Sequence, residues 1–192
     1  MDQELNPRIE EAKQGKRQLL FVDASHFVLM AFLGYLWSLT RVFLKSPSGR
    51  QRYNVLGAFN AITHELITVT NTTYINAQSV IDLMSKLCEK YTDSCITLVL
   101  DNARYQRCKA VIDFAEEKGI ELLFLPSYSP NLNLIERLWK YIKNECLYNK
   151  YHEKFACFKF TIDECLNNIN GKHKKAIESL MSLNFQLFDN AS

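Results

Sequence analysis

The 192-residue sequence predicts a mixed α/β fold, in which helices pack on the faces of a sheet. Three observations lead to this prediction. Strand-like runs come first, apolar residues at helical spacing begin near residue 76, and strand-like and helix-like segments then alternate. With 47% hydrophobic residues, the chain can bury the core of one fairly large domain.

Several short segments have the composition of strands. Residues 19–22 form an apolar run that ends at Asp23. Residues 95–100 (CITLVL) are nearly all apolar or β-branched, as a strand covered on both faces requires, and Asp101 follows them directly. The other predicted strands are residues 42–44, 53–59, 66–70 and 122–125.

Helices are predicted where apolar residues recur every three or four positions. Val80, Met84 and Leu87 follow this spacing after Asn76, a residue type that favours helix N-caps. A later helix stops at Gly119. We expect helices over residues 76–91, 103–118, 155–169 and 172–183, together with one that begins after Asn133.

Composition excludes several classes of protein. No apolar run approaches the roughly 18 residues that a membrane span needs, and residues 1–18 are charged where a signal peptide would be apolar. The six cysteines form no CxxC pair and no zinc-type cluster, which argues against a structural metal or a disulfide framework. We therefore expect a cytoplasmic, nucleoid-associated protein without a membrane partner. Residues 1–18 would be a charged remnant or linker, and residues 19–192 one domain.

Three carboxylates follow or begin predicted elements. Asp23 and Asp101 would meet at one edge of the sheet if their strands are neighbours, and Glu136 lies in the first helical turn after a polar loop. Oxygen ligands without cysteine or histidine suit Mg²⁺ or Mn²⁺, and two such ions would neutralise the repulsion among three crowded acids. The sequence therefore predicts a site for phosphoryl transfer.

Each acid also has a structural interpretation. Asp101 could be the N-cap of the helix that follows it, and Asp23 could be a solvated residue at a strand end. Asn133 and Glu136 could form a capping box at the start of their helix. The combination of the three acids favours the chemical interpretation.

Basic residues gather in the last third of the chain. Residues 137–175 contain nine Lys or Arg against four Asp or Glu, although the whole chain carries a net charge of only +2. A solvated helical face explains such a run, and so does a surface that binds phosphates. The candidates for phosphate contacts are Arg104, Arg107, Arg137, Lys140 and Lys143.

Four segments together resemble the catalytic domain of the insertion-sequence-630 transposases, in the mariner superfamily of DDE transposases. The segments are FVDASHF with Asp23, SGRQRYNVLGAFN, TLVLDNARYQ with Asp101, and FLPSYSPNLNLIERLWKYIK with Glu136. In this chain 34 residues separate the second acid from the third. The resemblance covers about residues 19–166.

The resemblance implies an RNase H-like fold with a mixed five-stranded sheet, in which Asp23, Asp101 and Glu136 bind two Mg²⁺ or Mn²⁺ ions. Such enzymes use water to cut the ends of a mobile DNA element, and the freed 3′ hydroxyl then attacks target DNA at a TA dinucleotide. By the same resemblance, further residues would shape this site. They are Asn102, Tyr128, Ser129, Asn131 and Asn133.

The chain also differs from the family pattern. Members usually carry a helix-turn-helix region that reads the element's ends, and only 22 residues precede Asp23 here. We expect that region to be absent, so that end recognition needs a separate partner or a homodimer. Gln106 stands where many relatives have histidine. Two alternative functions remain: a non-catalytic DNA-binding or assembly fragment of a transposase, and an RNase H-like nuclease acting on branched or hybrid nucleic acid.

Overall fold

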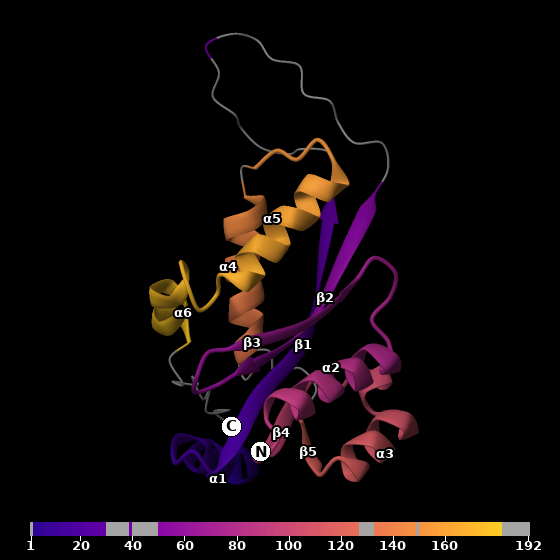
Figure 1. Ribbon diagram of the computed structural model, residues 1–192, viewed down its shortest axis with the longest axis vertical. Coiled ribbons are helices and arrows are strands. Elements are labelled where there is room, and N and C mark those ends of the chain that lie inside the picture. Colours follow the sequence, from indigo (N-terminus) through magenta and orange to yellow (C-terminus); the bar gives the residue numbers. More distant parts are fainter. Residues whose placement is uncertain (1, 30–38, 40–49, 127–132, 149, 182–192) are drawn as a thin grey trace, which may run out of the picture.

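The computed structural model describes residues 2–29, 39, 50–126, 133–148 and 150–181, and its core is one mixed sheet of five strands (Figure 1). The strand order is β3-β2-β1-β4-β5. β2 pairs antiparallel with β1 and β3, whereas β4 pairs parallel with β1 and β5. The strands are β1 (Arg17–Leu29), β2 (Gln51–Asn60), β3 (Leu66–Asn71), β4 (Cys95–Leu100) and β5 (Ile120–Phe124).

Helices cover both faces of this sheet. One face packs against α2 and α3, and the opposite face packs against α1, α4, α5 and α6. The helical elements are α1 (Asp2–Lys13), α2 (Ala77–Lys90), the 3₁₀ turn η1 (Arg104–Gln106), α3 (Lys109–Glu117), α4 (Leu134–Leu147), α5 (Phe155–Asn167) and α6 (Lys174–Leu180). The predicted fold class and the two helical layers are therefore confirmed.

The alternation of side chains along β1 shows how the two layers are built. Leu20 and Val22 are buried with α2 and α3, whereas Phe21 and Phe27 are buried with α4 and α5. This period of two is what a strand covered on both faces requires. It also determines that Asp23 points to the same side of the sheet as Phe21, which is the side of α4.

Several predicted elements differ from the structure. The helix expected over residues 103–118 is divided into η1 and α3, because Cys108 has an extended backbone (ψ 153°) that a helix interior cannot contain. Residues 1–18, expected to be a charged remnant or linker, contain α1, whose Leu5, Ile9 and Ala12 are buried in the core. The strand predicted over residues 42–44 lies outside the described residues.

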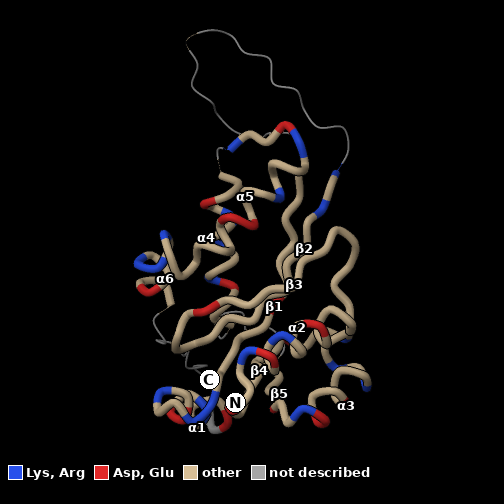
Figure 2. Tube along the Cα trace, viewed as in Figure 1, with Lys and Arg blue, Asp and Glu red and all other residues tan. Residues whose placement is uncertain are grey.

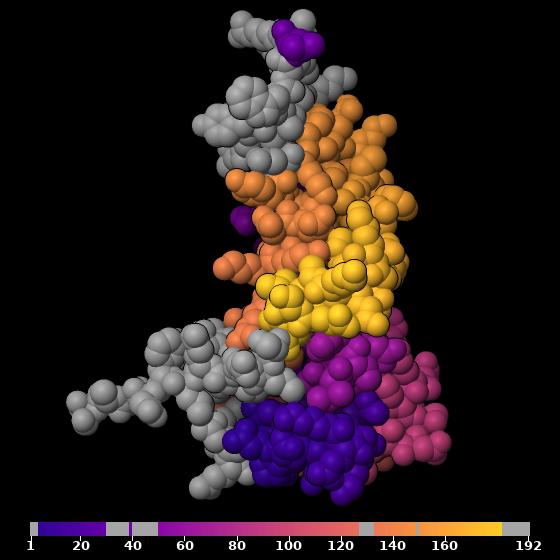
Figure 3. Space-filling view, turned by 90° about the vertical axis from the view of Figure 1, so that its left-hand side faces the viewer, coloured from indigo at the N-terminus to yellow at the C-terminus, as the bar shows by residue number. Residues whose placement is uncertain are grey.

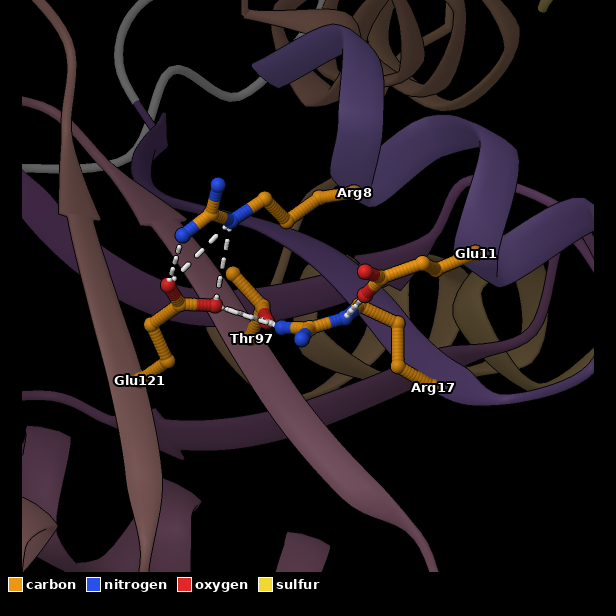
Figure 4. Close-up of polar contacts among 5 residues, drawn as sticks. All are labelled: Arg8, Glu11, Arg17, Thr97 and Glu121. Atoms are coloured by element: carbon orange, nitrogen blue, oxygen red, sulfur yellow. Dashed lines mark hydrogen bonds and ion pairs between the residues drawn. The ribbon is translucent and has the colours of Figure 1, made fainter. Parts of the chain in front are cut away.

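Charged side chains attach α1 to the ends of three strands (Figure 4). Glu121 on β5 accepts hydrogen bonds from Arg8 on α1, from Arg17 on β1 and from Thr97 on β4. The Nη2 of Arg8 lies 2.5 Å from the Oε1 of Glu121, and Arg17 also donates to Glu11 at 2.6 Å. In the space-filling view α1 (indigo) lies at the lower end of this side, below the C-terminal helices in orange and yellow (Figure 3).

None of the helices in the described ranges is both long and apolar enough to cross a lipid bilayer.

Candidate active site

The register of two parallel strands brings the two aspartates together. The last paired residues of β1 and β4 are Val22 and Leu100, so Asp23 and Asp101 are the next residues along the two strands. Both side chains are half-buried. The expectation that the two acids share one edge is therefore met, at the carboxyl end of β4, where α/β folds commonly place their chemistry.

Asp23 does not end its strand, contrary to the sequence prediction. β1 continues to Leu29 because it pairs with β2 along this half, with Asp23 opposite Gly57 and Leu29 opposite Gln51. Only the pairing with β4 stops at Val22. Asp23 therefore lies where β1 leaves its parallel neighbour, on a backbone held from the other side by β2.

Glu136 reaches this region from α4. The buried side chains of Ile135 and Leu138 hold the first turns of the helix against the core, and Glu136 between them is exposed. Partial burial, followed by the charge of Asp101, raises the pKa of Glu136 above its usual range. The third acid is therefore close enough to Asp101 for their charges to interact.

The pKa of Asp23 is strongly raised. Burial, opposed by the Ala24 backbone N–H and reinforced by the charges of Asp101 and Glu136, raises the pKa of Asp23 to about 7. The indole of Trp139 also lowers this pKa. Crowded carboxylates raise one another's pKa in this way, so the three acids form one electrostatic group.

Within the described part of the chain, no group of three or more His, Cys, Asp or Glu side chains has the geometry to hold a metal ion. The donor set nevertheless fits a hard divalent cation, because it consists of carboxylate oxygens whose mutual repulsion a cation would remove.

The alternative structural roles are met only in part. Asp101 accepts a hydrogen bond from the Ala103 N–H at 3.3 Å, but the N-cap of α3 is Cys108. Asn133 is the N-cap residue of α4, yet its side chain makes no capping bond, so the capping box with Glu136 does not form. The Asn133 backbone oxygen accepts the Glu136 N–H instead, and both polar atoms of the Asn133 amide are buried without a partner.

The predicted phosphate contacts lie in two groups. Arg104 and Arg107 are exposed on and just after η1, with the Arg107 guanidinium 4.8 Å from the ring centre of Phe124 at the end of β5. Along α4, Lys140 and Lys143 are exposed and Arg137 is half-buried. Figure 2 shows further Lys and Arg where α4 ends and where β2 and α5 begin, with acidic residues between them.

The loop before α4 can be compared with the prediction only at its end. Tyr128, Ser129 and Asn131 lie outside the described residues. Asn133 is buried beside the start of α4, and Asn102 is exposed directly after Asp101.

Sequence reasoning missed two neighbours of the acids. Burial, followed by the charges of Asp101 and Asp23, raises the pKa of Tyr105 to about 12, so the Tyr105 hydroxyl lies near both aspartates. Ser25, two residues after Asp23 on the same face of β1, is buried and its hydroxyl has no partner. The sequence places Tyr105 on the apolar side of a predicted helix and not at the site. No local sequence pattern marks Ser25 as a site residue.

Comparisons with known proteins agree with this architecture. The family model described as "DDE superfamily endonuclease" matches residues 18–159. A search of curated proteins found no match.

Solved structures with the same fold include transposases and integrases. The Mos1 mariner paired-end complex with Mn has a TM-score of 0.64 and 17% identity, over 97% of this chain and 61% of that one. The catalytic domain of Mos1 mariner transposase gives 0.56 and 16%, over 97% and 91%. The HTLV-2 integrase catalytic core with magnesium, in its trimeric form, gives 0.53 and 12%, over 82% and 86%. The chain thus spans about three fifths of the Mos1 transposase in the DNA complexes it resembles.

Proposed function

This chain belongs to the DDE superfamily of endonucleases, and on that premise we propose that it cleaves DNA phosphodiester bonds with divalent metal ions held by Asp23, Asp101 and Glu136. The observation that carries the proposal is the electrostatic grouping of these acids at one edge of the sheet. Burial and the neighbouring carboxylates raise the pKa of Asp23 to about 7. A site that concentrates negative charge in this way is stable in its ionised form only when cations balance it.

The proposed metals are Mg²⁺ or Mn²⁺, and the proposed number is two. The carboxylates of Asp23, Asp101 and Glu136 would hold these ions, whose chemistry would be to activate a water or hydroxyl nucleophile and to stabilise the leaving oxygen of a phosphodiester. The neighbouring strands β1 and β4 fix the backbones of Asp23 and Asp101. Glu136 is exposed at the start of α4, and its side chain would turn toward them to complete the ligand set.

We further propose that the substrate is a mobile DNA element and its target, as in the insertion-sequence-630 transposases. The similar Mos1 structures are described as complexes with a transposon end and as a strand transfer complex, which supports DNA end cleavage followed by strand transfer. The exposed Arg104, Arg107, Lys140 and Lys143 would bind DNA phosphates. Insertion at a TA dinucleotide, and end recognition by a homodimer or a separate partner, belong to the same proposal.

A second candidate is a non-catalytic DNA-binding or assembly fragment of a transposase. The observation in its favour is that the acids of the described residues do not already form a metal-holding group. The two candidates differ in one measurable respect, because only the enzyme has a metal-dependent cleavage activity that the acids control.

Cleavage of supercoiled plasmid DNA in Mn²⁺ separates the candidates. We expect the wild-type protein to nick the plasmid and Asp101→Asn to abolish nicking without lowering the melting temperature. The matched control is Asp113→Asn, which changes an exposed aspartate of α3 on the other side of the sheet and should nick as the wild type does. An unchanged rate in Asp101→Asn would reject the site, and an inactive wild type would favour the non-catalytic fragment.

A further inference from the structure

We propose that the indole Nε1–H of Trp139 donates a hydrogen bond to the ionised carboxylate of Asp23, and that Gly57 is required because its missing side chain leaves room for the indole. Trp139 would then be a positioning residue that holds the first acid for the metal. The effect of Trp139 on metal binding rests on the proposed function, but the hydrogen bond itself can be measured without catalysis.

The contact between Trp139 and Gly57 locates the indole. A Cβ atom on Gly57 would lie 2.7 Å from the Cη2 and 2.8 Å from the Cζ2 of Trp139, closer than real Cβ contacts come. The six-membered edge of the indole therefore lies against the backbone of Gly57. Because Cζ2 is separated from Nε1 by a single ring atom, the N–H group lies on this same edge.

The register of β1 and β2 then brings that edge to Asp23. Gly57 is the direct cross-strand partner of Asp23, and partners in an antiparallel pair point to the same face of the sheet. Trp139 is buried on that face with α4. The indole N–H and the carboxylate are therefore neighbours, independently of any titration.

The N–H group also lacks any other partner. The Nε1 atom of Trp139 is buried and makes no hydrogen bond of normal geometry in the described residues. Buried N–H groups in folded proteins nearly always have an acceptor. A small rotation of the ionised carboxylate would complete the bond.

The position of Trp139 on α4 gives this contact a function. Trp139 follows Glu136 by three residues, so the two side chains lie on neighbouring positions of one helix surface. The same helix would thus supply the third acid and a donor to the first. An indole N–H can only donate, so it would fix one carboxylate oxygen and leave the other for the cation.

The test is the indole ¹⁵N–¹H NMR signal of Trp139. The chain has two tryptophans, Trp37 and Trp139, and the signal lost in Trp139→Phe identifies the one of interest. Asp23→Asn should move this signal, because the acceptor loses its charge. Asp113→Asn removes the charge of an exposed side chain on α3 and should leave the Trp139 signal unchanged.

Metal binding supplies the second readout. Trp139→Phe keeps an aromatic ring but removes the donor, and outer-shell changes of this kind weaken metal affinity by about tenfold or more. We expect that loss in a Mn²⁺ titration followed by melting temperature. The control is Tyr141→Phe on the same helix, whose hydroxyl contacts the Nδ1 of His173 at 2.8 Å, and it should bind Mn²⁺ as the wild type does.

Two outcomes would overturn the inference: a Trp139 signal that does not respond to Asp23→Asn, or an unchanged Mn²⁺ affinity in Trp139→Phe. The NMR arm uses the native tryptophan, so it decides the question even if Trp139→Phe does not fold. If the Trp139 signal responds to Asp23→Asn but the wild-type protein shows no metal-dependent cleavage, the proposed function is contradicted and the hydrogen bond is established.

Discussion

Removing the charge of Asp23 should stabilise the metal-free protein, although it should destroy activity. Burial and the nearby charges of Asp101 and Glu136 raise the pKa of Asp23 from 3.8 to about 7. The folded state therefore holds a proton more tightly than the unfolded state does. An acid with a raised pKa favours folding at low pH, and that contribution is lost as the pH rises to about 7.

The size of the effect follows from the difference between the two pKa values. A gap of about three pH units is worth about 4 kcal/mol at about 1.4 kcal/mol per unit, and partial exposure of the side chain reduces this to about 2–4 kcal/mol. Asn in place of Asp removes the cost, since it has no charge in either state. For a chain of this length the gain corresponds to a rise in melting temperature on the order of 10 °C.

The assay is thermal unfolding of wild type and Asp23→Asn in a chelator at several pH values. The gain in melting temperature should be close to zero near about pH 4, grow as the pH rises, and level off above about pH 7. Asp113→Asn is the control, because its exposed side chain lies on α3 away from the acids. A gain that does not depend on pH, or no gain at all above neutrality, would refute the raised pKa of Asp23 from which this prediction follows.

Two further predictions concern the scaffold. Hydrogen bonds from Arg8 hold the pKa of Glu121 at about 2, so its contribution to stability is present above about pH 4.5 and is lost as the pH falls toward about 2. Glu121→Gln should therefore cost about 1 kcal/mol at neutral pH in urea unfolding, a value reduced for the 35% exposure of the side chain, and equal stabilities at neutral pH would contradict this. Gly57→Ala should cost about 1–3 kcal/mol because the added Cβ overlaps the Trp139 ring. Gly171→Ala, whose Cβ would meet only ordinary contacts from Asn168 at 3.5 Å, should be nearly neutral, and similar losses in both variants would argue against the tight contact.

Local sequence patterns predict those elements whose buried residues follow a clear apolar pattern. The run CITLVL matches β4, and the Asn76 cap and the apolar spacing after it match α2, in which the Asn76 side chain accepts from the Ser79 N–H at 3.1 Å. α1 was missed because its many charged residues conceal Leu5, Ile9 and Ala12, which become buried only when the helix packs against the sheet.

Only the part of the site that lies at the ends of apolar strands could be predicted from the sequence. Asp101 follows an apolar strand, but the second half of β1 contains polar residues such as Asp23 and Ser25, so its extent depends on pairing with the distant β2. The contact of Trp139 with Gly57 likewise joins residues far apart in the chain. The periodicity of apolar residues in the sequence does not predict such a contact, because the contact depends on strand register and helix position together.

The central claim is that Asp23, Asp101 and Glu136 bind divalent cations. Anomalous diffraction from crystals soaked in Mn²⁺ tests it most directly. The account predicts two manganese peaks at about 2.0–2.3 Å from carboxylate oxygens, with all three residues as ligands and Glu136 turned toward the aspartates. Manganese peaks found only at other places would contradict it. So would an empty site in crystals soaked at a Mn²⁺ concentration at which the protein in solution cleaves DNA.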